Sequence, residues 1–247
     1  MRFGWIPNEP DSRDWPLQPL MDDLRFGDPS GNEPSIEQFL PNPRYRQYNY
    51  STCTAGAYKT GWRALRAAEG KPDFDPSTFQ IYYNGRRQSG KFLNFHKVDG
   101  GAYPRDVAKA AAKYGFGPEE DWPQQANHIN KPPPMANVAF GFSTSGVSYY
   151  WITGDNRVDQ IDFALRNHWP ICLGTQVGDN WFNYRGIQDG ELGLPKENKG
   201  GHYLLITRHM GNGVMKFTNW WSWGEGLLSR EVIKANITRD IMVMKRS

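Results

Sequence analysis

The sequence predicts an α+β protein in which a helix-rich first half packs against a strand-rich second half. Apolar residues recur at helical spacing in the first half, apolar runs of strand length occupy the second half, and a proline-rich stretch separates them. The chain has 247 residues, which is enough to bury a substantial core as one compact domain or as two closely packed lobes.

Two helices in the first half have clear start and stop signals. The first follows Ser51, a good N-cap residue, and ends at Gly70. Its apolar side chains recur at helical spacing: Ala55, Tyr58, Trp62, Leu65 and Ala68. The second is expected from Pro104 to Tyr114, because proline suits the first turn and a glycine follows. A shorter helix is expected within 79–84.

The second half is expected to be mainly strands, after the proline-rich linker 116–137. One helix is indicated between Val158 and Trp169. Strands are expected at about 171–177, 203–209, 214–219 and 240–244. We therefore expect a single domain over 1–247: a helical lobe at about 45–120, a β-rich lobe at about 125–247, and an extended arm, 1–44, that wraps the body.

Composition excludes several classes of protein. Lys and Arg number 29 against 26 acidic residues, and a scattered net charge of +3 predicts no nucleic-acid or membrane partner. No apolar run approaches the roughly 20 residues of a membrane helix, and Met1–Pro7 lacks the apolar core of a signal peptide. The two cysteines, Cys53 and Cys172, favour a reducing compartment, either cytoplasmic or virion-associated. No Cys/His pair has metal-ligand spacing, so no metal or other cofactor is expected.

Four residues suited to thiol chemistry occur in the order Gln47, Cys53, His202 and Asn219. A thiol becomes nucleophilic as a thiolate, and a helix N-terminus and a neighbouring imidazolium both lower its pKa. Cys53 is expected in the first turn of its helix. Gln47, six residues earlier, offers an amide that joins the Cys53 N–H in binding an oxyanion. Each residue alone has an ordinary structural explanation, but the four in this order favour a catalytic set.

Hairpin geometry favours His202 as the base among the five histidines. Residues 210–213 indicate a four-residue turn, which would pair His209 with Val214. In that register His202 and Asn219 are diagonal neighbours on one sheet face. An asparagine oxygen that accepts the imidazole N–H fixes the tautomer and directs the other ring nitrogen at the sulfur.

These motifs resemble those of the papain-like C1 cysteine peptidases, especially the compact prokaryotic and phage members. The spacing from Cys53 to His202 agrees with the roughly 130–150 residues typical of that family. The matching segments cover nearly the whole chain: Gly4–Pro7, Pro10–Trp15, Gln47–Ala57, Gly100–Pro104, Trp181–Ile187 and Asn219–Gly226.

The resemblance implies a papain-like fold, with a helical lobe packed against a β-rich, barrel-like lobe and the active site in the cleft between them. It implies that peptide bonds of a protein or peptide substrate are hydrolysed through a thioester acyl-enzyme, without a cofactor. It also implies the site residues. Catalytic roles fall to Cys53 as nucleophile, His202 as base and then acid, Asn219 as orienter and Gln47 as oxyanion donor, and substrate-binding roles to Gly100, Gly101, Gly201 and Trp221.

Departures from the family pattern leave a second class open. Ser51-Thr52 replaces the Gly-Ser of many relatives, and Trp220 replaces a small Ser. We also expect no inhibitory pro-segment, because the family-like opening starts near Met1. The alternative is a catalytically weak or inactive papain-fold protein that acts in assembly, for example as a virion component with a viral partner. A third hypothesis is a peptidoglycan amidase with related Cys/His chemistry. Asn219 and Gln47 argue against it, because such amidases usually use a different third residue.

Overall fold

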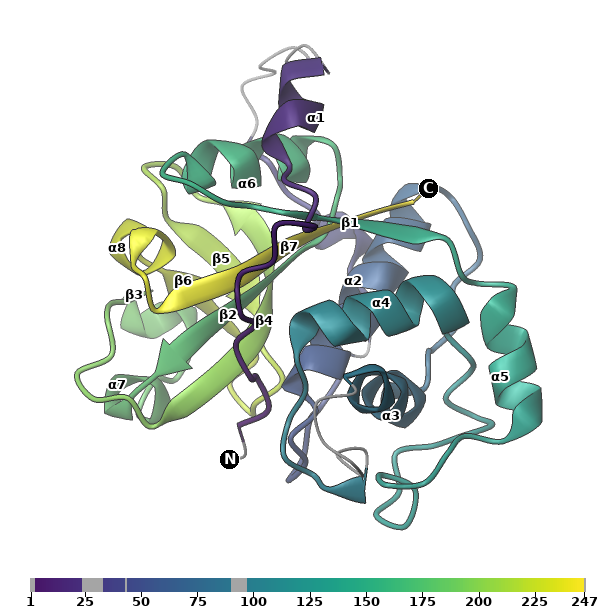
Figure 1. Ribbon diagram of the computed structural model, residues 1–247. Coiled ribbons are helices and arrows are strands. Elements are labelled where there is room, and N and C mark those ends of the chain that lie inside the picture. Colours follow the sequence, from purple (N-terminus) through teal and green to yellow (C-terminus); the bar gives the residue numbers. More distant parts are fainter. Residues whose placement is uncertain (1–2, 24–32, 43, 90–96, 247) are drawn as a thin grey trace.

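The structure is a computed structural model that describes residues 3–23, 33–42, 44–89 and 97–246. Figure 1 shows α3, α4 and α5 gathered on one side of the molecule and the sheet, with α6, α7 and α8, on the other. The helices of the first half are α1 (Gln18–Asp23), η1 (Glu37–Phe39), α2 (Cys53–Ala68), α3 (Thr78–Gln88), α4 (Pro104–Tyr114) and α5 (Met135–Phe142). Those of the second half are α6 (Arg157–Arg166), α7 (Asp179–Phe182), η3 (Ile187–Asp189) and α8 (Arg230–Lys234).

The strands of the described chain form one mixed sheet with the order β1-β7-β2-β4-β5-β6-β3. The sheet stays open, with β1 and β3 at its edges, so the expected barrel-like lobe is a curved open sheet and not a closed barrel. The strands are β1 (Val147–Trp151), β2 (Ile171–Val177), β3 (Glu191–Leu192), β4 (Gly200–His209), β5 (Met215–Thr218), β6 (Glu225–Leu228) and β7 (Thr238–Arg246).

The predicted register of the β4–β5 hairpin is correct near the site and wrong near the turn. Leu205 lies opposite Thr218, as the predicted pairing requires. Beyond a bulge the register shifts, and His209 pairs with Met215 where Val214 was expected. The turn is one residue longer because Val214 closes it, with its carbonyl accepting from the Met210 N–H at 2.9 Å. The bulge absorbs that extra residue before the site is reached.

The helix predictions hold with two adjustments. The helix from Pro104 to Tyr114 is confirmed as α4, but α3 is longer than the six residues expected. The prediction that Ser51 caps the first helix is wrong, since Thr52 occupies the N-cap position. Ser51 is held elsewhere: its N–H donates to the carboxylate of Asp99 at 3.0 Å and its hydroxyl to the Asp99 carbonyl at 3.3 Å.

The N-terminal arm crosses between the two sides of the molecule. Isolated bridges join Trp5 to Ala102, just before α4, and Pro16 to Trp151 at the end of β1. In Figure 1 the purple arm runs down between the sheet and α4, and the N-terminus lies at the lower end of that seam. Among the described residues, no helix combines the length and apolarity needed to span a bilayer.

Candidate active site

Cys53 is the first residue of α2, and its side chain is fully buried. The positive end of the helix dipole favours a thiolate at this position. Burial acts more strongly in the other direction and raises the Cys53 pKa to about 12, against hydrogen bonds from the backbone of Tyr203 and from Thr54 that lower it. In the conformation described, Cys53 is therefore a protonated thiol at neutral pH.

His202 and Asn219 form the hydrogen bond that the hairpin register predicts. The imidazole Nε2 lies 2.5 Å from Oδ1 of Asn219. The same oxygen accepts the backbone N–H of Trp220 at 2.7 Å, and because that N–H can only donate, the amide orientation is fixed. Nε2 therefore carries the proton, and the neutral ring has its unprotonated nitrogen at Nδ1.

Nδ1 of His202 is buried and makes no hydrogen bond to any residue that the structure describes. The ring stacks on Trp221, with centroids 4.2 Å apart. Burial lowers the His202 pKa to about 4, although the bond to Asn219 acts to raise it. The sulfur of Cys53 is hydrogen-bonded to the backbone of Tyr203, the residue after His202, so the thiol lies against β4 next to the residue that carries the imidazole.

Gln47, the predicted oxyanion donor, lies beside Asn219. Its backbone N–H donates to the Trp220 carbonyl at 3.2 Å, which places it next to Asn219. Its side-chain nitrogen donates to the Tyr50 carbonyl at 2.5 Å. The oxyanion role of Gln47 stays a prediction.

The predicted substrate-binding residues differ in exposure and in whether their backbone groups are already hydrogen-bonded. The N–H of Gly101 donates to the hydroxyl of Tyr82 at 2.9 Å and is already occupied, while Gly100 is exposed. Gly201 and Trp221 flank His202. Sequence reasoning missed Ala102, whose N–H and carbonyl both bond to the chain that lies in the cleft. The glycine pair before it was the available signal, since glycines permit a close backbone approach.

The N-terminal segment, residues 3–8, covers Cys53. A Cβ built on Gly4 would lie 3.0 Å from the Cys53 sulfur and 2.1 Å from the Ser51 carbonyl oxygen, so only glycine fits. The Gly4 carbonyl accepts the Ala102 N–H at 2.8 Å. This expected family-like opening therefore lies across the nucleophile.

No group of three or more His, Cys, Asp or Glu side chains suited to hold a metal ion occurs in the described part of the chain. Asn219, His202 and the thiol form a set that works by proton transfer and nucleophilic attack. In the conformation described the thiol itself is protonated, because burial raises its pKa to about 12.

A fold search gives the papain-like architecture. Xylellain, a cysteine protease from Xylella fastidiosa, superposes with a TM-score of 0.79 over 99% of this chain and 96% of its own, at 23% identity. A procathepsin B from Trypanosoma congolense superposes with a TM-score of 0.70 over 96% of this chain and 83% of its own, at 14% identity. The chain has the papain-like fold of the C1 cysteine proteases.

Sequence comparison identifies one further relative. No family model matches the chain. An uncharacterised peptidase C1-like protein of Acanthamoeba polyphaga mimivirus is 27% identical over 166 residues, which are 63% of this chain. The match spans about half, 52%, of that relative. The relative's sequence and the fold agree on the class of protein, a papain-like cysteine peptidase fold.

Proposed function

We propose that the protein is a cysteine endopeptidase that hydrolyses peptide bonds through a thioester acyl-enzyme. The observation that carries this proposal is the bond between Asn219 and Nε2 of His202, which leaves Nδ1 as an unprotonated base on the residue before Tyr203, whose backbone binds the Cys53 sulfur. The curated relative and the fold neighbours support the same class.

The residues divide the reaction into two acyl transfers. His202 Nδ1 takes the proton of the Cys53 thiol, and the sulfur attacks the peptide carbonyl carbon. The tetrahedral intermediate collapses when the protonated ring gives its proton to the leaving amine, which leaves a thioester. His202 next takes a proton from water, the resulting hydroxide attacks the thioester, and the acid product leaves as the thiol reforms.

The developing charge on the carbonyl oxygen needs donors aimed at it. The N–H of Cys53, in the first turn of α2, has no partner within its own helix by virtue of its position. The side-chain amide of Gln47 is the other donor of the proposal. Asn219 does not touch the substrate; it orients His202 and is a positioning residue.

The site suits peptide substrates because one residue of its wall can form main-chain hydrogen bonds with an extended chain. Both the N–H and the carbonyl of Ala102 are engaged by an extended segment in the present structure. Main-chain pairing of this kind binds extended chains with little regard to their side chains. Cys53 and Cys172 are both free thiols, which suits the reducing, cytoplasmic or virion-associated location that we propose.

The direct test is hydrolysis of an unfolded protein substrate by the parent chain and by Cys53→Ala. We expect the parent to generate new amino termini and the variant to generate none above background. Trapping a substrate acyl group on Cys53, detected by the mass of the intact protein, would identify the thioester. Equal hydrolysis by both proteins would exclude the proposal, and release of peptidoglycan fragments instead of peptides would indicate an amidase.

A second candidate, an inactive papain-fold protein that acts in assembly, is favoured by one observation. The Cys53 side chain is completely buried and its pKa is raised to about 12. A thiol in that state is not a working nucleophile at neutral pH. If Cys53 never reacts with iodoacetamide under native conditions, and no substrate is cleaved, this second candidate holds.

A further inference from the structure

A group of hydrogen-bonded residues connects the turn before Cys53 to residues 98–105, which we call the cleft wall. We propose that Asp99 is a positioning residue of the candidate active site: its carboxylate sets where Ala102 stands relative to Cys53. This inference rests on the proposed function, because it assigns the backbone of a peptide substrate to Ala102. The hydrogen bonds that carry it do not depend on that function.

The carboxylate of Asp99 accepts hydrogen bonds from two parts of the chain. The backbone N–H of Ser51, two residues before Cys53, donates to Oδ1 at 3.0 Å and to Oδ2 at 3.3 Å. The hydroxyl of Tyr82, in α3, donates to the same Oδ1 at 2.8 Å. Hydrogen bonds to a carboxylate are stronger than those between neutral groups. One side chain therefore joins the start of α2 to α3.

The bonds at Tyr82 extend this connection to the cleft wall. The N–H of Gly101 donates to the Tyr82 hydroxyl at 2.9 Å. A backbone N–H can only donate and a carboxylate can only accept, so the hydroxyl proton points to Asp99. Tyr82 is completely buried, and burial raises the pKa of its phenol well above the usual value, so the hydroxyl keeps its proton. Asp99 thus reaches Gly101, the neighbour of Ala102, through one hydroxyl.

The helix α3 also fixes the chain just before Asp99. Arg86 follows Tyr82 by about one helical turn, and its guanidinium lies 3.9 Å from the centre of the Tyr82 ring. The guanidinium donates to the carbonyl of Val98 and, at 2.5 Å, to that of Ile129. Arg86 is 1% exposed, so these bonds form away from water. The first residue of the cleft wall is therefore anchored independently of the Asp99 carboxylate.

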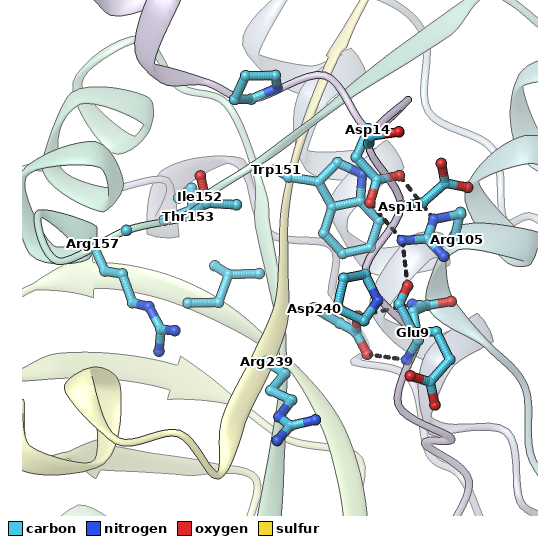
Figure 2. A pocket seen from close by; sticks show the side chains of 16 residues that line it. Glu9, Asp11, Asp14, Arg105, Trp151, Ile152, Thr153, Arg157, Arg239 and Asp240 are labelled. Atoms are coloured by element: carbon cyan, nitrogen blue, oxygen red, sulfur yellow. Dashed lines mark hydrogen bonds and ion pairs between the residues drawn. The ribbon is translucent and has the colours of Figure 1, made fainter.

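The other end of the cleft wall is anchored through α4. Arg105, the second residue of α4, donates to the Glu9 carbonyl at 2.9 Å and to the carboxylate of Asp14 at 2.8 Å. Figure 2 shows these bonds beside a pocket of about 620 Å³ that Arg105 lines. With both ends anchored, loss of the Asp99 carboxylate should displace the middle of the wall without unfolding it.

The middle of the wall matters because Ala102 offers both of its backbone groups to an extended chain. In the present structure its N–H donates at 2.8 Å and its carbonyl accepts at 3.2 Å. Its direct contact with α2 is long, since the Thr54 hydroxyl lies 3.5 Å from the Ala102 carbonyl oxygen. A misplacement of about 1 Å between bound substrate and nucleophile can lower the rate about 100-fold. Asp99 therefore affects the reaction without touching the substrate.

The test compares two substrates in the full-length chain. A long peptide can pair with Ala102, whereas p-nitrophenyl acetate has no backbone group that can. We would measure kcat and KM on both, above the Cys53→Ala background, for the parent, Asp99→Ala, Asp99→Asn and Tyr82→Phe. Asp121→Ala is the matched control, because Asp121 is an exposed aspartate in the same half of the chain.

We expect Asp99→Ala to lower kcat/KM on the peptide roughly 10- to 100-fold and to leave that on p-nitrophenyl acetate within about twofold of the parent. Asp99→Asn should recover much of the loss, because an amide oxygen can accept from Tyr82 and Ser51 as Oδ1 does. Tyr82→Phe should resemble Asp99→Ala, since it removes the acceptor of the Gly101 N–H. Asp121→Ala should match the parent on both substrates.

Amide exchange gives a second readout that needs no activity. Exchange at Ser51 and Gly101 should accelerate in Asp99→Ala, whereas the amides of α4 should keep their rates. Acceleration throughout α4 would indicate general destabilisation and would overturn the positioning role.

Equal losses on both substrates would overturn the inference, because a purely structural defect affects both. An active parent with an unimpaired Asp99→Ala variant would overturn it as well, and would leave the proposed function intact. A parent that hydrolyses neither substrate would contradict the proposed function instead. In that case local acceleration of exchange at Ser51 and Gly101 would still support the connection through Asp99, and unchanged exchange would exclude it.

Discussion

Replacing His202 with Gln should remove a specific dependence of stability on pH. His202 is fully buried, and burial lowers its pKa from 6.5 to about 4. In the unfolded chain this residue is protonated below pH 6.5, whereas in the folded chain it is protonated only below about pH 4. The folded state of the parent therefore loses stability as the pH falls from 6.5 to 4, and the loss levels off below that.

The size of this loss follows from the two pKa values. Each pKa unit corresponds to about 1.4 kcal/mol, so the drop from 6.5 to about 4 amounts to about 3 kcal/mol in the free energy of unfolding. Gln keeps a polar side chain that can donate to Asn219 but takes no proton. The variant therefore keeps the pH dependence of the acidic residues and lacks this contribution.

Urea unfolding, followed by the fluorescence of the 10 tryptophans, gives the free energy of unfolding at several pH values from 7.5 to 4. The difference between parent and variant should shrink by about 3 kcal/mol between pH 6.5 and 4. An NMR titration should show the His202 ring, identified by its absence in the variant, unprotonated down to about pH 4. Parallel stability curves, or a ring that titrates near pH 6.5, would refute the burial argument.

Three further predictions concern the site and the fold. In a chain with the segment released, Gln47→Ala should lower kcat roughly 100- to 1000-fold with little change in KM, and an unchanged kcat would remove Gln47 from the oxyanion site. Asn219→Ala should lower kcat and shift the pH profile of kcat/KM, because the ring loses its fixed tautomer; a lower kcat with an unmoved profile would indicate a structural role only. Ser77→Ala should destabilise the fold by about 1 kcal/mol in urea unfolding, because the Ser77 hydroxyl accepts the Gln80 N–H at the start of α3; unaltered stability would contradict its capping role.

The sequence correctly predicted those helices and strands whose ends are marked by residues within or next to the element. α4 begins at a proline and ends before a glycine, and β2 is an apolar run, so both were placed at their observed bounds. The pairing of His202 with Asn219 followed from the parity of one hairpin, and the bulge near the turn left it intact. The spatial relation of His202 and Asn219 could thus be predicted from the sequence, whereas the position of Cys53 beside β4 could not.

Contacts between distant parts of the chain could not be predicted in this way. Residues 3–8 have no periodicity, and their position depends on the glycines of β2 and β4, far along the sequence. The short strands β3 and β6 were missed because each has few residues and, among the described strands, β3 pairs only with β6, which lies far along the sequence. The Ser51 cap failed because Asp99, almost fifty residues away, competes for its hydroxyl.

The covered thiol also bears on chemical durability. Oxidation by peroxide acts on the thiolate and goes on to sulfinic and sulfonic acids that cannot be reversed by ordinary reductants. A Cys53 thiol that is buried and protonated is a poor target for that reaction. While residues 3–8 cover Cys53, the thiol should therefore resist oxidation by peroxide. A protein in which Cys53 is exposed should lose the thiol under the same treatment.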